Sequence, residues 1–78
     1  MIKAYVLLTL EVDKADKIIK EIKKKISNVI DAEEVTGPYD GVVRVEAKDL
    51  KELAREIIPN IYKIDGVIDT TTAIVIEE

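Results

Sequence analysis

The first twelve residues alternate between apolar and more polar side chains. Every second position is apolar, in a series that comprises Ile2, Ala4, Val6, Leu8, Leu10 and Val12. Residues two apart point to the same side of an extended chain, so this series indicates a strand with one buried face. The intervening positions are polar at both ends and apolar in the middle, at Tyr5 and Leu7. We therefore predict a strand over Ile2–Val12.

Two later segments show the three- and four-residue spacing that is typical of amphipathic helices. The first apolar stripe consists of Ala15, Ile18, Ile19, Ile22 and Ile26. The second stripe consists of Leu50, Leu53, Ala54, Ile57 and Ile58. Charged residues occupy the opposite side of the first segment, which predicts a helix with one face against the core and one in solvent.

Helix ends are also indicated. Asp13 is the predicted cap of the first helix, because its carboxylate can accept free amide hydrogens at a helix start. Asp49, with Glu52 three residues later, resembles a capping box for the second helix. Pro59 lacks an amide donor and clashes one turn back, yet Ile61 and Ile64 keep the helical phase. We therefore predict a kinked second helix that reaches about Lys63.

Three further strands complete the pattern. They are predicted over Asn28–Thr36, Gly41–Ala47 and Val67–Ile76, with Asp65-Gly66 as the turn before the last. The order strand, helix, strand, strand, helix, strand predicts a single domain over residues 1–78 with a ferredoxin-like α+β fold. In that fold both helices cover one face of a four-stranded antiparallel sheet.

The uncovered sheet face is expected to be apolar. Tyr5 and Leu7 point to it from the first strand, and the last strand carries apolar residues on both faces, with Ala73 and Val75 on one of them. An antiparallel sheet normally presents polar residues to solvent. We therefore predict face-to-face sheet dimerisation through Tyr5, Leu7, Ala73 and Val75. Scattered apolar residues on the surface of a monomer are the alternative.

Composition excludes several kinds of chemistry. The chain has no histidine and no cysteine, which rules out imidazole-dependent and thiol catalysis, disulfides and sulfur-bound metals. Adjacent acids at Glu33-Glu34 and Glu77-Glu78 would point to opposite faces of a strand, so neither pair predicts a carboxylate dyad. We expect no catalytic residue, no metal and no cofactor.

Charge and hydropathy limit the partners. The net charge of −4 argues mildly against direct DNA binding, which favours a basic surface. No apolar run approaches a membrane span and no signal peptide is visible, so a cytoplasmic location is expected. Abundant Lys, Glu and Ile with no Gln is a composition typical of heat-adapted proteins.

The stretch VTGPYDGVV, residues 35–43, combines Gly-Pro and Asp-Gly in one turn between two strands. Together with RVE, a capped helix and the later run IDGVIDTTTAIVI, it resembles the effector-binding or RAM domain of Lrp/AsnC transcriptional regulators. The resemblance covers essentially the whole chain. Its most specific parts are the Gly-x-Tyr-Asp turn and the Gly-Val and Thr-Thr entry into the last strand. Pro38 departs from the polar residue expected in the family's turn and stiffens the loop.

The resemblance implies a function. Members of the family bind small amino acids near the Gly-x-Tyr-Asp turn, dimerise through their sheets and join into octameric rings. By position, this implies Gly37, Tyr39 and Asp40 as effector-site residues, with hydroxyls from Thr70, Thr71 and Thr72. Full-length members carry an N-terminal helix-turn-helix, whereas this sequence starts at the first strand. The resemblance therefore implies a stand-alone form that modulates full-length Lrp/AsnC regulators or senses amino acids alone.

Plainer interpretations of the same residues remain open. Asp40 with Gly41 could form an ordinary turn, Tyr39 could be a packing residue, and the threonines could be simple strand formers. At the level of function, a purely structural assembly domain without ligand is one alternative. An ACT-like small-molecule sensor, which shares the same element order, is another.

Overall fold

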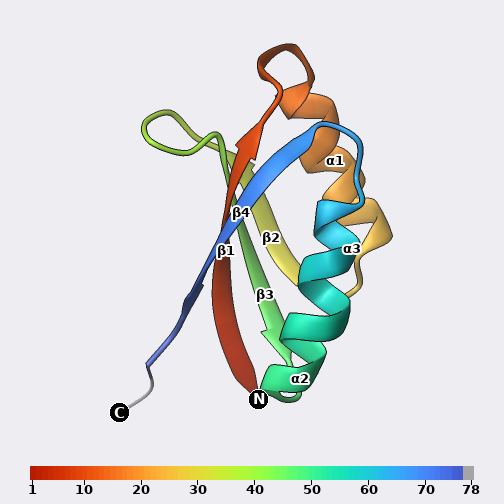
Figure 1. The fold of residues 1–78 in the computed structure, drawn as a ribbon, viewed down its shortest axis with the longest axis vertical. Helices are drawn as coiled ribbons and strands as arrows, with labels where there is room; N and C mark the ends of the chain where they lie inside the picture. Colours follow the sequence, from red (N-terminus) through yellow and green to blue (C-terminus); the bar gives the residue numbers. More distant parts are fainter. Residues whose placement is uncertain (77–78) are drawn as a thin grey trace.

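The described residues form four strands and two helical segments in the predicted order (Figure 1). A computed structural model describes residues 1–76. The strands are β1 (Ile2–Leu10), β2 (Val29–Glu34), β3 (Gly41–Ala47) and β4 (Val67–Ile74). The first helix is α1 (Ala15–Lys25), preceded by a 3-10 turn at Val12–Lys14. The second helical segment runs through α2 (Leu50–Glu52), a π-helical turn at Leu53–Ile57 and α3 (Ile58–Tyr62).

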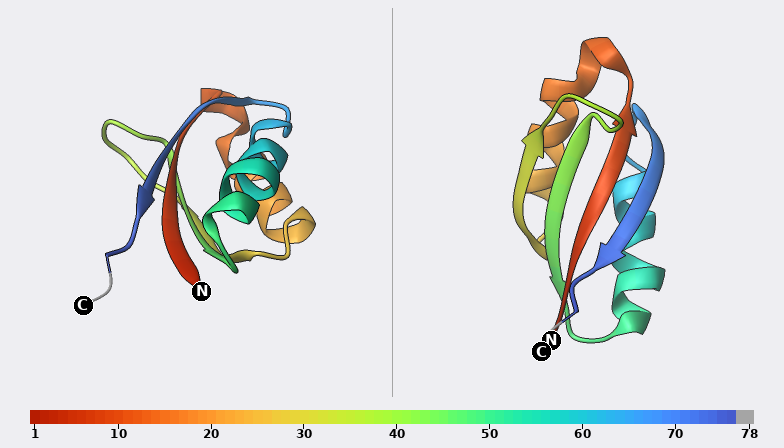
Figure 2. Two further views of the ribbon diagram at one scale, coloured as in Figure 1. Left: turned by 60° about the horizontal axis from the view of Figure 1, so that its bottom comes forward. Right: turned by 90° about the vertical axis from the view of Figure 1, so that its left-hand side faces the viewer.

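The four strands form one sheet in the order β2-β3-β1-β4, with every neighbouring pair antiparallel. Both helical segments lie on the same side of this sheet (Figure 1). Seen from the other side, all four strands are in full view with the helices behind them (Figure 2). This arrangement confirms the predicted ferredoxin-like α+β fold.

The core lies between the sheet and the helices, and its residues are those that the two periodicities select. The alternating β1 series from Ala4 to Leu10 and the complete α1 stripe are buried. Among the described residues every buried side chain is apolar. Each large aliphatic side chain removed from water in this way contributes about 1.5–3 kcal/mol, so these apolar patterns supply the main driving force for folding.

Pro59 remains inside the second helical segment, as predicted, because the preceding turn is wider than an α-helical one. The amide of Ile58 donates to the carbonyl of Leu53, five residues back. A π turn of this kind accommodates one extra residue, and such turns are a known way for a helix to absorb a local irregularity. The helix then continues to Tyr62, close to the predicted end at Lys63.

The two predicted helix caps differ in outcome. Asp49 accepts a hydrogen bond from the Glu52 amide at 2.8 Å, and the Glu52 carboxylate accepts the amide of Lys48 at 2.9 Å. The reciprocal capping arrangement is thus present, although Glu52 binds the residue before the cap. The prediction for Asp13 was wrong. The strand ends at Leu10, the chain coils at once into a 3-10 turn, and Asp13 lies within that turn without capping α1.

Other predicted details need correction. Leu50 is 56% exposed and Ala54 is also exposed, because the buried line of the second helix steps by four residues through Leu53, Ile57 and Ile61. Strand ends were predicted too long at Val12, at Asn28 and Thr36, and at Ile76. The apolar pattern of β2 is irregular because the β2–β3 register shifts between Val29 and Asp31. This shift leaves Ile30 in a bulge, 47% exposed. Glu77 and Glu78, and the prediction made for them, lie outside the described residues.

Candidate functional site

The turn between β2 and β3 projects beyond the sheet on the side away from the helices (Figure 1). Its base is closed by a hydrogen bond from the Val35 amide to the Asp40 carbonyl, at 2.9 Å. Asp40 also fastens the turn to the neighbouring strand β1. Its amide donates to the Leu8 carbonyl at 2.8 Å, and its Oδ2 accepts the Leu10 amide at 2.9 Å. The carboxylate therefore bonds the adjacent strand, where an ordinary Asp-Gly turn would bond its own backbone.

Gly37 has a backbone φ of +126°, a conformation that side-chain-bearing residues rarely adopt. A Cβ at this position would meet no described atom within 4 Å, so conformation alone favours glycine there. Gly41 is the opposite case, because a Cβ there would stand 3.0 Å from Ile19 Cδ1. Tyr39 is half-buried beside Asp40. The turn is thus held in one shape by its backbone and rests directly on the core.

The three threonines lie in the middle of β4. Thr70 and Thr72 are paired with Leu8 and Val6 and share the helix-covered side, while Thr71 is paired with Leu7 and faces the open side. The three hydroxyls are therefore divided between the two faces of the sheet. Thr70 and Thr72 are half-buried and Thr71 is exposed, so all three hydroxyls are within reach of solvent or of a second molecule.

Within one chain the turn and the threonines come to the same end of the sheet without touching across it. Asp40 bonds Leu8 from one side of β1, and Thr70 is paired with Leu8 from the other. Since neighbouring strands are about 4.8 Å apart, the two are separated by about 10 Å with β1 between them. One subunit therefore brings the predicted residues together but does not enclose a ligand with them.

The open sheet face carries the predicted apolar residues together with a cation that sequence reasoning missed. Arg44 is paired with Tyr5 across the β1–β3 ladder, and Val42 is paired with Leu7. Tyr5 is 39% exposed, Leu7 is half-buried and Ala73 is exposed. The alternation of β3 could have indicated this position, because Arg44 lies between Val43 and Val45, which are both buried.

Two hollows flank Tyr5 on this face. The larger measures about 440 Å³ and is lined by Lys3, Tyr5, Ile30, Arg44, Glu46 and Val75. The smaller measures about 60 Å³ and lies toward Asp31 and Glu33. Neither hollow is enclosed, so side chains of a second molecule packed on this face could enter them.

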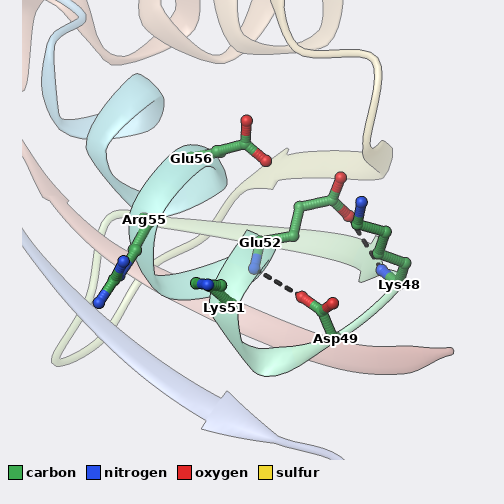
Figure 3. A pocket seen from close by; sticks show the side chains of 6 residues that line it. All are labelled: Lys48, Asp49, Lys51, Glu52, Arg55 and Glu56. Atoms are coloured by element: carbon green, nitrogen blue, oxygen red, sulfur yellow. Dashed lines mark hydrogen bonds between the residues drawn. The ribbon is translucent and has the colours of Figure 1, made fainter.

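A further hollow of about 370 Å³ lies at the start of the second helix (Figure 3). It is lined only by polar and charged residues, namely Lys48, Asp49, Lys51, Glu52, Arg55 and Glu56. Figure 3 shows that Arg55 and Glu56 point away from each other, while Asp49 and Glu52 are occupied in capping the helix. The side chains do not converge on a common point, so the hollow is explained by helix capping.

Residues 1–76 contain no group of three or more side chains arranged to hold a metal ion. Over the same residues, no helix is long and apolar enough to cross a membrane. The ammonium of Lys14 lies 3.4 Å from Asp65 and 3.5 Å from Glu11. These two carboxylates, Asp65 above all, raise the pKa of Lys14 above its ordinary value.

Comparison with known families gives a match over nearly the whole chain. Residues 3–78 match the model of the Lrp/AsnC ligand binding domain. An uncharacterised HTH-type transcriptional regulator of Pyrococcus horikoshii is 36% identical over 73 residues, which is 94% of this chain and 46% of the regulator. A homocitrate synthase of Sulfurisphaera tokodaii is 43% identical over 53 residues, or 68% of this chain and 11% of the enzyme. The chain thus spans less than half the length of either relative.

Solved structures agree. A Thermus thermophilus protein superposes with a TM-score of 0.89 at 31% identity, over 100% of this chain and 96% of that one. A transcriptional regulator of Neisseria meningitidis, solved as a complex with L-Met, has a TM-score of 0.84 at 17% identity. That match covers 99% of this chain and 51% of the regulator, and it shows a shared fold.

Proposed function

This chain belongs to the Lrp/AsnC ligand-binding domain family, and from that premise we propose that it is a non-catalytic module that binds an amino acid and assembles with copies of itself. The observation that carries the proposal is the 35–40 turn. Its Asp40 is fixed on both its amide and its carboxylate by β1, at the end of the sheet where the threonines of β4 also lie. A turn held this firmly presents its groups in one fixed geometry, which favours ligand binding because little ordering is needed.

The proposed ligand site uses Gly37, Tyr39 and Asp40 from one subunit, with hydroxyls of Thr70, Thr71 and Thr72. Asp40 pairs with the α-ammonium group of the ligand. A carboxylate accepts hydrogen bonds at both oxygens, so the Leu10 amide on Oδ2 leaves Oδ1 for the ligand. Tyr39 supplies an apolar wall. Because β1 separates the turn from the threonines within one chain, the site is closed by a neighbouring subunit.

The proposed assembly begins with a dimer formed by two open sheet faces. Tyr5, Leu7, Ala73 and Val75 supply apolar contacts, and Arg44 adds a charged group near the centre. Dimers then join around the ligand sites into a ring. Apolar area on a sheet face that is removed from water by a second copy contributes about 25 cal/mol per Å².

The proposed partners are full-length Lrp/AsnC regulators, in addition to further copies of this chain. A ligand-binding domain of this family can join such regulators through the same sheet surface and alter their binding to DNA. With a net charge of −4, it makes no DNA contact of its own. The proposed location is the cytoplasm, where such regulators act.

A second candidate function follows from the homocitrate synthase match. A segment of a biosynthetic enzyme resembles 68% of this chain at 43% identity, higher than the 36% found for the Pyrococcus regulator. The domain could therefore act on an enzyme in the same ligand-dependent way. The module itself is again non-catalytic, and only the protein that it regulates differs.

The test is a stability screen against all twenty amino acids in moderate denaturant. A ligand that binds only the folded protein, at about 100 times its dissociation constant, adds about 2.7 kcal/mol to the free energy of unfolding. We expect one class of amino acid to stabilise the protein, and we expect Asp40→Asn to abolish that gain. If no amino acid stabilises the protein at millimolar concentration, the ligand-binding proposal fails and a purely structural assembly domain replaces it.

A further inference from the structure

The outer strands of the sheet are β2 and β4, and their outward backbone groups are partly occupied by side chains. In an antiparallel strand, alternate residues turn their amide and carbonyl toward the neighbouring strand, and the others turn them outward. On β4 the Val75 amide donates to the Lys3 carbonyl of β1 at 2.9 Å. Because the direction alternates along the strand, the backbone groups of Thr71 and Asp69 also point inward to β1. Those of Thr72 and Thr70 point outward.

Two outward groups of β4 are capped. The carboxylate of Asp69 accepts the outward amide of Thr70 at 2.9 Å, through its Oδ1. The hydroxyl of Tyr62, from the end of α3, donates to the outward carbonyl of Ile68 at 2.9 Å. The half of this edge nearest the α3–β4 turn therefore has a donor and an acceptor already satisfied.

The other outer strand has the same device. The Val35 amide donates inward to Asp40, so on β2 the inward residues include Glu33 and Asp31, and Ala32 faces outward. The Oδ1 atom of Asp31 accepts the outward Ala32 amide at 2.9 Å. In both outer strands, an aspartate thus covers the amide of the residue that follows it.

The sequence of β4 explains why its edge needs cover. Residues 70–76 read TTTAIVI, seven residues that are uncharged, free of proline and rich in β-branched side chains. Such a segment on an open sheet edge is a template for pairing with the same segment of another molecule. Asp69 stands directly before this segment, and the Tyr62 hydroxyl bonds the carbonyl of Ile68, two residues before it.

We propose that Asp31, Asp69 and Tyr62 close the two sheet edges to strand addition, so that copies of this chain associate through the open sheet face and do not grow edge to edge. The excluded partner is an extended strand of a second copy. This inference rests on the proposed function only in naming the open face as the surface that remains available.

The test compares Asp69→Ala, Asp69→Asn and Tyr62→Phe with Asp16→Ala. Asn keeps a side-chain carbonyl that can accept the Thr70 amide but removes the charge. Asp16→Ala is the matched charge control, because Asp16 is exposed on α1, outside the sheet, and forms an exposed ion pair with Lys20. Each protein is followed by sedimentation velocity and thioflavin T fluorescence over a hundredfold range of concentration.

We expect the unaltered protein, Asp69→Asn and Asp16→Ala to keep one discrete assembly at all concentrations. Asp69→Ala and Tyr62→Phe should lose mass to large, thioflavin-positive species, and a triple variant that adds Asp31→Ala should lose the most. If Asp69→Ala behaves like the unaltered protein, the inference is overturned. It is also overturned if Asp69→Asn and Asp16→Ala aggregate as much as Asp69→Ala does, because the loss of a negative charge would then be the cause.

Hydrogen exchange supplies a readout on the cap itself. The Thr70 amide should exchange about fivefold faster in Asp69→Ala than in Asp69→Asn, the change expected from loss of a hydrogen bond of ordinary strength. Equal rates would overturn the inference even if aggregation occurred. If the unaltered protein is a monomer, the proposed open-face dimer is contradicted. The comparison of the variants would still test whether the side chains of Asp69 and Tyr62 protect the sheet edge.

Discussion

Replacing Asp40 by alanine should destabilise the protein, because its side chain acts as part of the sheet. The Asp40 amide bonds the Leu8 carbonyl, so the Leu10 amide points to the place where the next acceptor of β3 would stand. The chain turns away there, and Asp40 Oδ2 serves as the acceptor instead, at 2.9 Å. Hydrogen bonds to charged groups contribute about 1.5–3 kcal/mol, and the partial exposure of Asp40 favours the lower end. We expect a loss of about 1.5–2 kcal/mol.

Urea denaturation followed by circular dichroism measures this loss without heating. With a slope of about 1–3 kcal/mol per M for a small domain, the midpoint should fall by about 0.5–2 M. Asp40→Asn is the matched variant, because its side-chain carbonyl can still accept the Leu10 amide. It should lose less than about 0.7 kcal/mol, and yet it should lose amino-acid binding as completely as the alanine variant does, because the negative charge is gone.

The two variants separate the structural role of Asp40 from its proposed role with ligand. If Asp40→Ala costs less than about 0.5 kcal/mol, the Leu10 amide does not depend on this carboxylate and the reasoning fails. If Asp40→Asn keeps the full amino-acid response, the carboxylate is structural only. The plain-turn interpretation would then hold for this residue.

Three other predictions concern the fold. Ile22→Ala should cost about 2–5 kcal/mol in urea denaturation, since Ile22 is 0% exposed and its loss leaves a cavity between α1 and the sheet. Gly66→Ala should cost about 2–4 kcal/mol in the same assay, because the φ of Gly66 is +99° and the new Cβ would collide with Ile18 Cδ1. Gly37→Ala should cost only about 1 kcal/mol of backbone strain, because a Cβ there would meet no described atom within 4 Å. The raised pKa of Lys14 means that the stabilisation from its ion pairs is present below the ordinary lysine value of 10.5 and is lost as pH rises through the raised value. In denaturation at increasing pH, Lys14→Met should therefore lose less stability over that range than the unaltered protein.

The layers of the fold were predicted well, because buried positions recur along the sequence with the period of a helix or a strand. The β1 alternation from Ala4 to Leu10 and the α1 stripe were predicted correctly, since each residue in them is buried, whereas Val12 at the end of the predicted strand is 88% exposed. The prediction for the second helix failed at Leu50 and Ala54. The π turn changes which residues of the helix face the core, and no residue type is specific to such a turn. Pro59 was the only hint, and it was interpreted as a kink.

The candidate site was less predictable from the residues themselves. A turn over 35–40 followed from Gly37 and Asp40, but its attachment to β1 joins positions 30 residues apart, which no local pattern encodes. The caps on Thr70 and Ala32 depend on which amides face outward, and that follows from strand pairing. The ligand and the closing subunit were implied by resemblance to the family alone, because a site shared between molecules leaves no periodic pattern in one chain.

The central claim is that the open sheet face joins two copies of the chain, and sedimentation equilibrium tests it most directly. The unaltered protein should sediment at a multiple of its 8.7 kDa chain mass at micromolar concentration. Leu7→Asp, which places a charge in the middle of that face, should reduce the mass to 8.7 kDa while the circular dichroism spectrum stays the same. An unaltered protein that sediments as a single chain throughout this range, or a Leu7→Asp variant that keeps the assembly intact, would contradict the account.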